Sequence, residues 1–153
     1  MLQNKDFNIS VIGLGYVGLP LAIELSKKFQ VQAFDINFNR IIELKKGKDK
    51  NNEIKKIEFV KIKKKIKFTN QIQDLVKSNI YIITVPTPIT KNNNPDLSYL
   101  KIATKMVAKI LKKKDIVVYE STTYPGCTNE ICIPILEKYS KLKIIKDFSC
   151  GYS

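Results

Sequence analysis

Three glycines at fixed spacing and one acidic residue are the residues of this chain that point most directly to chemistry. Gly13, Gly15 and Gly18 form the pattern G-x-G-x-x-G, and Asp35 follows 22 residues after the first glycine. In such a pattern the first glycine permits a tight turn, the second lets the backbone approach a pyrophosphate, and the third lets a helix pack close to a strand. An acidic residue at this distance accepts hydrogen bonds from the ribose of an adenosine. The spacing therefore predicts a dinucleotide site.

The segments around these residues are the ones that such a site needs. Residues 8–12 (N-I-S-V-I) form a short apolar run with β-branched side chains, as is typical of a buried parallel strand. The glycines follow at once, a helical pattern covers about residues 17–29, and a second apolar run spans 31–36. Phosphates would then lie at the positive end of the helix. A glycine pattern alone is compatible with an ordinary turn, but the strand, helix, second strand and acid in register favour the dinucleotide interpretation.

The rest of the chain alternates between expected strands and helices. Strands are expected at 66–68, 80–85, 116–119 and 142–145, and helices at 38–46, 53–62, 72–77, 97–111 and 127–139. Asp96 or Ser98 is a candidate cap for the helix 97–111, and Pro134 is expected to kink the last helix. Alternating strands and helices with right-handed crossovers predict an α/β fold. Its sheet is expected to be Rossmann-type, doubly wound and mostly parallel, with helices on both faces.

The formal charge of +13 raises the question of nucleic-acid binding. Only one of the 27 basic residues, Arg40, is an arginine. Recognition of phosphates and bases usually draws on the planar fork of arginine, which lysine lacks. We therefore expect the lysines, including the run at 61–67, to form solvated surface such as an outer helix face. No nucleic-acid partner is expected, although a basic face can attract any anionic ligand.

The cysteines and the apolar runs exclude several other classes of protein. Cys127, Cys132 and Cys150 are odd in number, form no C-x-x-C, and are accompanied by no histidine. Neither a metal site nor a disulfide framework is expected, and reduced thiols in a cytoplasmic protein are the default. The N-terminus has no signal-peptide pattern, and no apolar run approaches the roughly 18 residues that a membrane span needs.

Four motifs in order carry a resemblance to a known family. G-L-G-Y-V-G-L-P at 13–20 is followed by D-I-N at 35–37 with Arg40, by V-P-T-P at 85–88, and by Y-E-S-T-T-Y-P-G-C at 119–127. Together they resemble the N-terminal NAD-binding domain of the UDP-glucose/GDP-mannose dehydrogenase family. The form E-S-T-x-Y-P-G-C is similar to the branch that acts on UDP-N-acetylhexosamines in bacterial surface-polysaccharide synthesis. The resemblance spans essentially the whole chain.

The resemblance implies NAD as the cofactor and assigns roles to residues. The residues expected around the pyrophosphate are Gly13, Gly15, Tyr16, Val17 and Gly18. Asp35 would bind the adenosine ribose and disfavour NADP, because a carboxylate repels a 2′-phosphate. Arg40 would lie beside the adenosine; a charge on the surface of the second helix is the alternative. Thr87 would border the cofactor, and Thr122 would be the catalytic residue, at the junction of nicotinamide and sugar, where the family uses this threonine to help place a water.

The implied enzyme is a nucleotide-sugar 6-dehydrogenase, an oxidoreductase that converts the C6 alcohol of a UDP-sugar to a carboxylate with two NAD. In the family a cysteine thiolate captures the aldehyde, and the resulting thioester is hydrolysed by water. That cysteine belongs to segments C-terminal to the NAD-binding domain, and full-length members form homo-oligomers. Residues 151–153 (G-Y-S) resemble the start of the family's G-x-S-P-E-R stretch.

We therefore expect residues 1–153 to be an NAD-binding domain truncated near its C-terminal end. The family's helical linker and C-terminal substrate domain would be absent, and the fragment, with only part of the UDP-sugar site, would be inactive alone. A free-standing NAD-binding sensor or regulatory module is the alternative. The loops at 86–88 and 120–122 weigh against a sensor, because a sensor has no need of loops that face a substrate.

Overall fold

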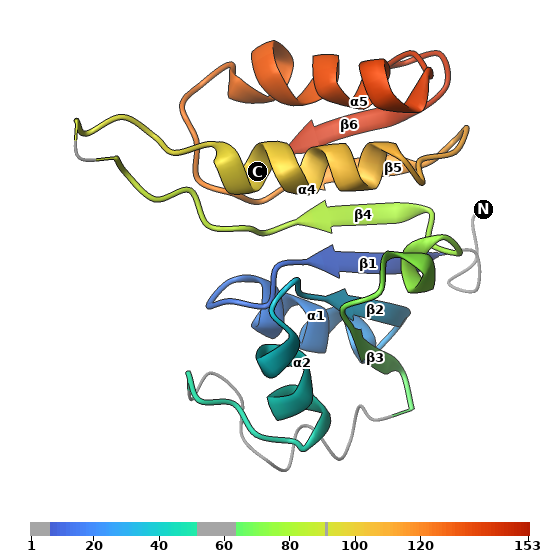
Figure 1. Cartoon of the computed structure of the whole chain (residues 1–153). Coiled ribbons are helices and arrows are strands. Elements are labelled where there is room, and N and C mark those ends of the chain that lie inside the picture. Colours follow the sequence, from blue (N-terminus) through green and yellow to red (C-terminus); the bar gives the residue numbers. More distant parts are fainter. Residues whose placement is uncertain (1–6, 52–63, 91) are drawn as a thin grey trace.

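The computed structural model describes residues 7–51, 64–90 and 92–153, and its described strands form one parallel sheet (Figure 1). The six strands are arranged in the order β3-β2-β1-β4-β5-β6. They are β1 (Asn8–Ile12), β2 (Gln30–Phe34), β3 (Ile66–Thr69), β4 (Ile80–Ile83), β5 (Ile116–Tyr119) and β6 (Ser149–Tyr152). The strand order reverses beside β1: β2 and β3 lie on one side of it, and β4, β5 and β6 lie on the other, as in a Rossmann fold. The predicted doubly wound α/β fold is confirmed.

Helices cover both faces of the sheet. They are α1 (Gly18–Ser26), α2 (Phe38–Lys45), α4 (Ser98–Ala108) and α5 (Ile133–Ser140), together with the short 3-10 helix η2 (Ile72–Leu75). Successive side chains of a strand point to opposite faces. Val11 of β1 accordingly belongs to the apolar core beneath α1 and α2, while its neighbour Ile12 belongs to the core beneath α4 and α5. Strand β1 is therefore buried on both faces, which explains its continuous apolar sequence.

Most expected elements are present, but one expected strand is not. Residues 142–145 do not form a strand, and the last strand of the sheet is β6. The reason is the backbone at the two ends of the apolar run, where Lys141 has φ 64° and Ile145 has φ 69°. Both values lie in the left-handed region, which an extended strand does not allow. Ile145 is consequently 92% exposed. The helix expected at 53–62 lies outside the described residues.

The helix expected at 127–139 is divided into two segments near Pro134. Its first turn is a π-helix at Thr128–Cys132, in which the N–H of Ile133 donates to the carbonyl of Thr128. Regular α-helix begins at Ile133, with Pro134 in its first turn. Proline has no N–H to donate four residues back, so it suits the start of a helix better than its interior. The irregularity was predicted at this place; its π-helical form was not.

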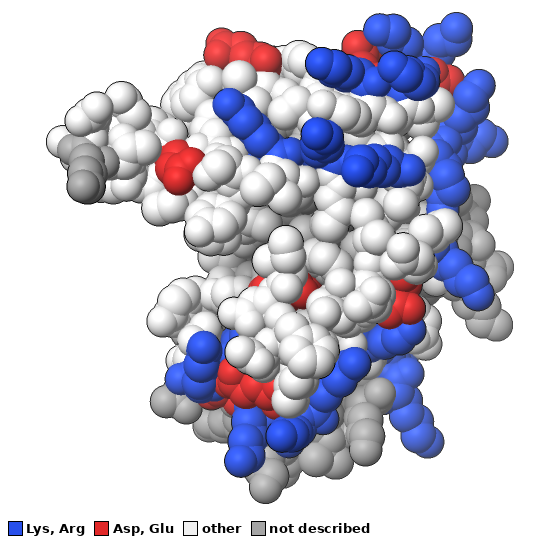
Figure 2. All heavy atoms as spheres, viewed as in Figure 1, with Lys and Arg blue, Asp and Glu red and all other residues white. Residues whose placement is uncertain are grey.

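Lysines lie mostly on the outer surfaces (Figure 2). Lys101 and Lys105 of α4 and its C-cap residue Lys109 are exposed at four-residue intervals. Within the lysine run at 61–67, residues 61–63 lie outside the described residues, and Lys67 lies in β3 rather than on a helix. Its ammonium is 2.7 Å from the carboxylate of Asp74. Among the described helices, none is long and apolar enough to cross a membrane.

Candidate functional site

The loop between β1 and α1 contains three glycines: Gly13 has a positive φ, Gly18 has no room for a side chain, and Gly15 faces open space. Gly13 has φ 100° and donates its N–H to the carbonyl of Phe34 at 2.9 Å, which makes the tight turn. A Cβ added to Gly18 would lie 1.8 Å from the carbonyl oxygen of Gly13. A Cβ added to Gly15 would have no atom within 4 Å. The loop therefore packs closely at both ends and leaves the backbone at Gly15 accessible.

Thr84 anchors the end of β1 from the neighbouring strand. Its buried hydroxyl lies 2.7 Å from the carbonyl oxygen of Gly13 and 3.0 Å from that of Ile12. A Cβ on Gly18 would also come within 2.4 Å of this hydroxyl. The sequence analysis missed this role for Thr84. Its signal is a threonine near the C-terminal end of the apolar run at 80–85, where parallel strands place ligand sites.

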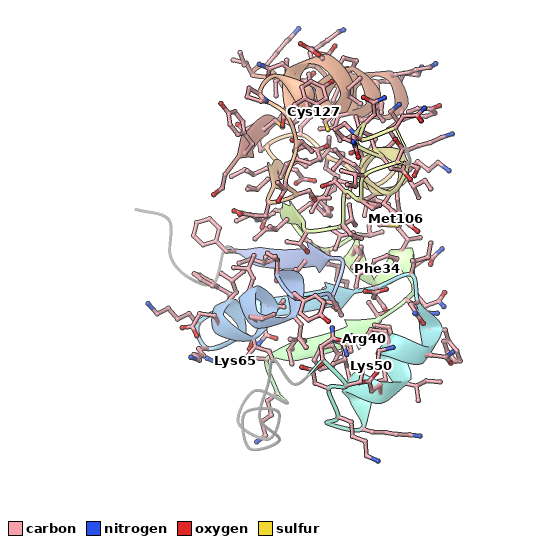
Figure 3. All side chains as sticks on the ribbon, turned by 90° about the vertical axis from the view of Figure 1, so that its left-hand side faces the viewer. Phe34, Arg40, Lys50, Lys65, Met106 and Cys127 are labelled. Atoms are coloured by element: carbon pink, nitrogen blue, oxygen red, sulfur yellow. The ribbon has the colours of Figure 1, made fainter. Side chains whose placement is uncertain are left out.

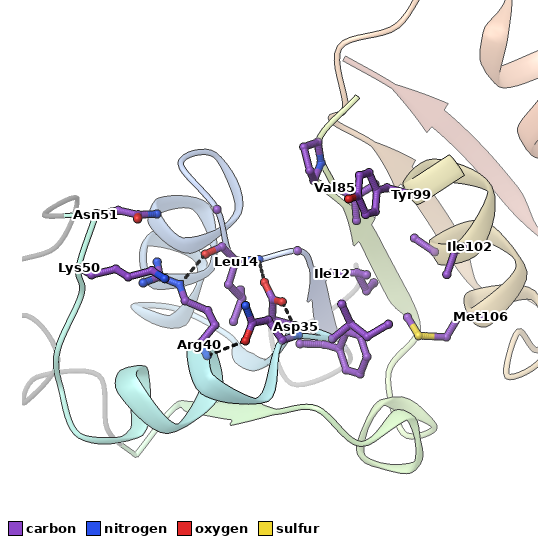
Figure 4. Close-up of a pocket in the computed structure, with 17 residues that line it drawn as sticks. Ile12, Leu14, Asp35, Arg40, Lys50, Asn51, Val85, Tyr99, Ile102 and Met106 are labelled. Carbon is purple, nitrogen blue, oxygen red and sulfur yellow. Dashed lines mark hydrogen bonds between the residues drawn. The ribbon is translucent and has the colours of Figure 1, made fainter. Parts of the chain in front are cut away.

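Asp35 directly follows β2, and both of its carboxylate oxygens accept backbone hydrogen bonds. Oδ2 accepts the N–H of Leu14 at 2.8 Å, and Oδ1 accepts the N–H of Asn37 at 2.8 Å. Each oxygen of an ionised carboxylate has a second acceptor position. The carboxylate is thus held beside the glycine loop and keeps the capacity to accept the hydroxyls of a ribose (Figure 4).

Arg40 is buried, with 5% of its surface exposed, although it lies on α2. Its Nε donates to the carbonyl of Leu14 at 3.0 Å. Its Nη1 lies 2.8 Å from the carboxylate of Asp49 and 3.3 Å from that of Glu43, so two acids compensate its charge. Its Nη2 has no hydrogen-bond partner among the described residues. The interpretation of Arg40 as a surface charge is wrong.

These residues surround a cavity of about 430 Å³ at the carboxyl ends of β1, β2 and β4. One wall comes from the glycine loop, from α2 and from the segment after α2, and its polar residues are Asp35, Asn37, Arg40, Lys50 and Asn51. The opposite wall is apolar and comes from the end of β4 and from α4, with Val85, Pro86, Tyr99, Ile102 and Met106 (Figure 4). The cavity lies where the strand order changes direction, which is where open α/β sheets bind ligands.

The cavity brings together only part of the predicted site. Gly13, Gly15, Asp35 and Arg40 line it. Tyr16 and Val17 follow on the same loop with 70% and 55% of their surface exposed, while Gly18 is buried at the start of α1; none of the three is part of the lining. The apolar wall and the Lys50–Asn51 segment were not predicted, because nothing in their local sequence indicates that they face the glycine loop.

The predicted Thr87 and Thr122 lie in two loops that are joined to each other, after β4 and β5. The hydroxyl of Thr87 donates to the carbonyl of Thr122, and the hydroxyl of Ser121 donates to that of Val85 at 2.7 Å. The side chain of Thr122 is exposed. Neither threonine is among the residues that line the cavity. The two loops are thus fixed relative to each other, with Thr122 presented at the surface.

The three cysteines lie apart from these groups, within or against the apolar core beneath α4 and α5. Figure 3 shows Cys127 well separated from Phe34 and Arg40. Burial raises the pKa of the Cys132 thiol to about 11 and that of the Cys150 thiol to about 12. A nucleophilic cysteine needs a lowered pKa, so these two thiols are unsuited to that role at neutral pH. The described residues contain no cluster of acidic and cysteine side chains able to hold a metal.

Comparison with known proteins agrees with this arrangement. Residues 7–153 match the UDP-glucose/GDP-mannose dehydrogenase family, NAD binding domain. The chain is 52% identical to UDP-N-acetyl-D-glucosamine 6-dehydrogenase of Pseudomonas aeruginosa, in an alignment that covers 97% of this chain and 35% of that protein. The protein of the same name from Salmonella typhi is 50% identical, with 100% and 36% covered. The solved structure of UDP-D-ManNAc dehydrogenase from Pyrococcus horikoshii superposes with a TM-score of 0.88 at 33% identity, covering 95% and 35%.

The chain therefore spans about a third of the length of these relatives.

Proposed function

Because this chain belongs to the UDP-glucose/GDP-mannose dehydrogenase family, we propose that it is the NAD-binding portion of a nucleotide-sugar 6-dehydrogenase acting on a UDP-N-acetylhexosamine. Such an enzyme oxidises the C6 alcohol of the sugar to a carboxylate with two NAD. Support for this substrate class comes from the two relatives at 52% and 50% identity, both of which are named UDP-N-acetyl-D-glucosamine 6-dehydrogenases.

One observation carries the cofactor assignment: the accessible backbone at Gly15 and the Asp35 carboxylate line the same cavity. Backbone N–H groups at Gly15 and at the start of α1 would bind the pyrophosphate of NAD, since a helix N-terminus favours negative charge. Asp35 would accept the hydroxyls of the adenosine ribose. The apolar wall formed by Tyr99, Ile102 and Met106 would receive the adenine. The residues present therefore fit this cofactor.

Asp35 would also select NAD over NADP. The 2′-phosphate of NADP would approach a carboxylate that two backbone N–H groups already hold in place. Bringing two negative groups together inside a cavity is costly, because little water remains to screen them. We therefore propose NAD, and not NADP, as the cofactor of this chain.

Bound NAD supplies the hydride acceptor, and the residues of this chain bind and orient it. Thr122 would face the junction of nicotinamide and sugar, on a loop that Thr87 holds by its hydrogen bond. The buried, weakly acidic thiols of Cys132 and Cys150 are not suited to capture an aldehyde. We therefore propose that the reaction requires residues other than these 153, and that the isolated chain binds NAD without turning over a UDP-sugar.

Titration of the chain with NAD and NADP tests the cofactor assignment. We expect clear preference for NAD, and a loss of at least about tenfold in NAD affinity for Asp35→Ala, because hydrogen bonds to a charged group are removed. Asp147→Ala is the control, because it removes a carboxylate that is not part of the cavity lining. Equal or tighter binding of NADP by the unmodified chain, or unchanged NAD affinity in Asp35→Ala, would overturn the assignment.

A second assay tests the absence of turnover. NAD and a UDP-N-acetylhexosamine are supplied to the 153-residue chain, and the formation of NADH is followed by its absorbance. We expect none from this chain and activity from a longer chain that contains the rest of a family member. Sustained NADH formation by the 153 residues alone would contradict the proposal, and single substitutions of Cys127, Cys132 and Cys150 would then identify the responsible thiol.

A further inference from the structure

We propose that the outer surface of α4 and α5 is a docking site for an anionic phospholipid bilayer. This surface, the α4–α5 patch, consists of Lys101 and Lys105 of α4, its C-cap residue Lys109, and Lys138 and Tyr139 of α5. All five residues are exposed, and Figure 2 shows lysine side chains gathered over these two helices. None of the five lines the cavity, so the inference is independent of the proposed NAD-binding function.

Three lysines of the patch form a row on the side of α4 that faces away from the core. Lys101, Lys105 and Lys109 follow one another at four-residue intervals. This interval separates neighbours by about 6 Å along a helix axis. The helix α4 contains no acidic residue, and its buried residues lie on the other side: Leu100, Ala103, Thr104, Val107 and Ala108. The row is therefore an uninterrupted line of positive charge.

Helix α5 adds a fourth lysine and an aromatic ring to this row. Lys105 Nζ lies 4.6 Å from the centroid of the Tyr139 ring, and Lys138 Nζ lies 5.7 Å from the same centroid. Two ammonium groups from different helices thus converge on one exposed ring. A hydrogen bond from Lys105 and the positive charges of the neighbouring lysines lower the pKa of Tyr139, as a positive field predicts.

The charge of the patch is not compensated by neighbouring acids. Across the described parts of the chain, no salt bridge joins any of its four lysines to a carboxylate. The acidic residue of α5, Glu137, lies 3.0 Å from Lys143 and also accepts the N–H of Ile144. The patch therefore attracts anions, and its arrangement determines which class of anion fits.

A flat anionic surface fits this arrangement better than a nucleic acid or an acidic protein does. Nucleic-acid recognition draws on arginine, and the patch contains none. The cores of protein interfaces are depleted in lysine, and exposed ion pairs stabilise them little. A bilayer needs only a field of exposed charges, each of which strengthens binding about fivefold. A tyrosine is also suited to the level of the lipid headgroups.

Vesicle binding by the full 153-residue chain tests the proposal. Sedimentation is measured with phosphatidylcholine vesicles and with vesicles in which about a third of the lipid is phosphatidylglycerol. We expect binding to the anionic vesicles at low salt, none to the neutral ones, and a loss of binding as salt rises. The patch variant combines Lys105→Gln, Lys109→Gln and Lys138→Gln. It should bind the anionic vesicles at least about tenfold more weakly.

A variant with the same net charge and an intact patch is the matched control. It combines Lys28→Gln, Lys46→Gln and Lys48→Gln, three exposed lysines that follow α1 and α2, on the opposite face of the sheet. We expect a loss of less than about threefold, because charges more than a Debye length from the bilayer are screened. Equal losses in the two variants would overturn the proposal, since only net charge would then matter. Absence of binding to the anionic vesicles at low salt would overturn it as well.

A fluorescent residue identifies the surface that contacts the bilayer. The chain has no tryptophan, so Tyr139→Trp places its one indole in the patch. The emission should shift to shorter wavelength on vesicle binding, whereas Tyr16→Trp, on the glycine loop, should show no shift. An unchanged spectrum of Tyr139→Trp in the bound state would overturn the proposal. Tighter binding to duplex DNA or to polyglutamate than to the vesicles, if the patch variant loses it, would assign the patch to that partner instead.

Discussion

The glycine loop and the helix pair α4–α5 are held in place by different kinds of interaction. The glycine loop, residues 13–18, is anchored by polar side chains that bind its backbone: Thr84 at Gly13, and Asp35 and Arg40 at Leu14. The helix pair packs mainly through buried apolar side chains, among them Leu100, Val107 and Leu136. A buried hydrogen bond from the Tyr119 hydroxyl of β5 to Thr104 of α4, at 3.0 Å, joins the pair to the sheet, and neither residue lines the cavity.

This difference predicts that ligand binding depends mainly on the glycine loop, and that folding stability depends mainly on the core beneath the helix pair. In the glycine loop the backbone itself would contact the ligand. The polar anchors therefore determine the shape of the loop, and the lack of a side chain at Gly15 leaves its backbone accessible to the ligand. In the helix pair the side chains fill a core, so their volume determines stability. We therefore expect substitutions in the loop to change ligand binding, and substitutions of those helix-pair residues that do not line the cavity to change stability alone. The exception is Gly18, where the loop packs against the sheet.

Gly18→Ala is expected to have the largest effect on stability. The new Cβ would lie 1.8 Å from the Gly13 carbonyl oxygen and 2.4 Å from the Thr84 hydroxyl, so the start of α1 must move away from the sheet. We expect the free energy of unfolding to fall by at least about 4 kcal/mol. Urea denaturation measures the change. Gly15→Ala, in open space, is the matched control with an expected change below about 1 kcal/mol; equal effects of the two substitutions would break the comparison.

Leu136→Ala tests the helix pair. Leu136 of α5 is fully buried in the core beneath α4 and α5 and is not part of the cavity lining. Removing its side chain should lower the free energy of unfolding by about 2–5 kcal/mol, because the remaining cavity collapses only in part. NAD affinity should remain within about twofold of the unmodified chain under conditions where the variant is folded. A large loss of affinity in the folded variant would show that the two regions are coupled.

Gly15→Val tests the loop, where we expect a substitution to change NAD affinity rather than stability. The valine side chain would occupy the open space at Gly15, where the backbone would approach the pyrophosphate. We expect NAD affinity to fall at least about 100-fold, with a change of less than about 1 kcal/mol in the free energy of unfolding. Calorimetric titration and thermal denaturation measure the two quantities. Retained affinity would mean that the loop is only a structural turn.

The smallest expected effect concerns pH and Cys132, in the core beneath α4 and α5. Burial raises the Cys132 pKa from its ordinary 9.0 to about 11. Between these values the unfolded chain has lost the thiol proton while the folded chain retains it, so the free energy of unfolding falls as pH rises. Urea denaturation at about pH 8 and about pH 10 should show a smaller decrease for Cys132→Ala than for the unmodified chain. Identical decreases would indicate that Cys132 does not contribute.

The sequence by itself determined the fold class, the bounds of β1 and β5, and the glycine loop with its acidic partner. These features depend on short-range patterns: the periodicity of apolar residues, the need for glycine in a tight turn, and the position of an acid after the next strand. The family was also identifiable from four motifs, and the match over residues 7–153 confirms it. The cofactor-binding and catalytic roles of all the predicted site residues, among them Asp35, Arg40 and Thr122, remain predictions.

Only the tertiary structure decided which distant residues complete the cavity and which charges are buried. The apolar wall on α4 lies more than 60 residues from Asp35 in the sequence, and Arg40 becomes a buried anchor because Leu14, Glu43 and Asp49 surround it. The strand expected at 142–145 is absent for a related reason. The apolar residues at 142–145 suggested a buried strand. The backbone instead turns at Lys141 and Ile145, so that Ile145 is exposed to solvent and the strand beside β5 is β6. Burial is a property of contacts between segments, which local sequence patterns do not specify.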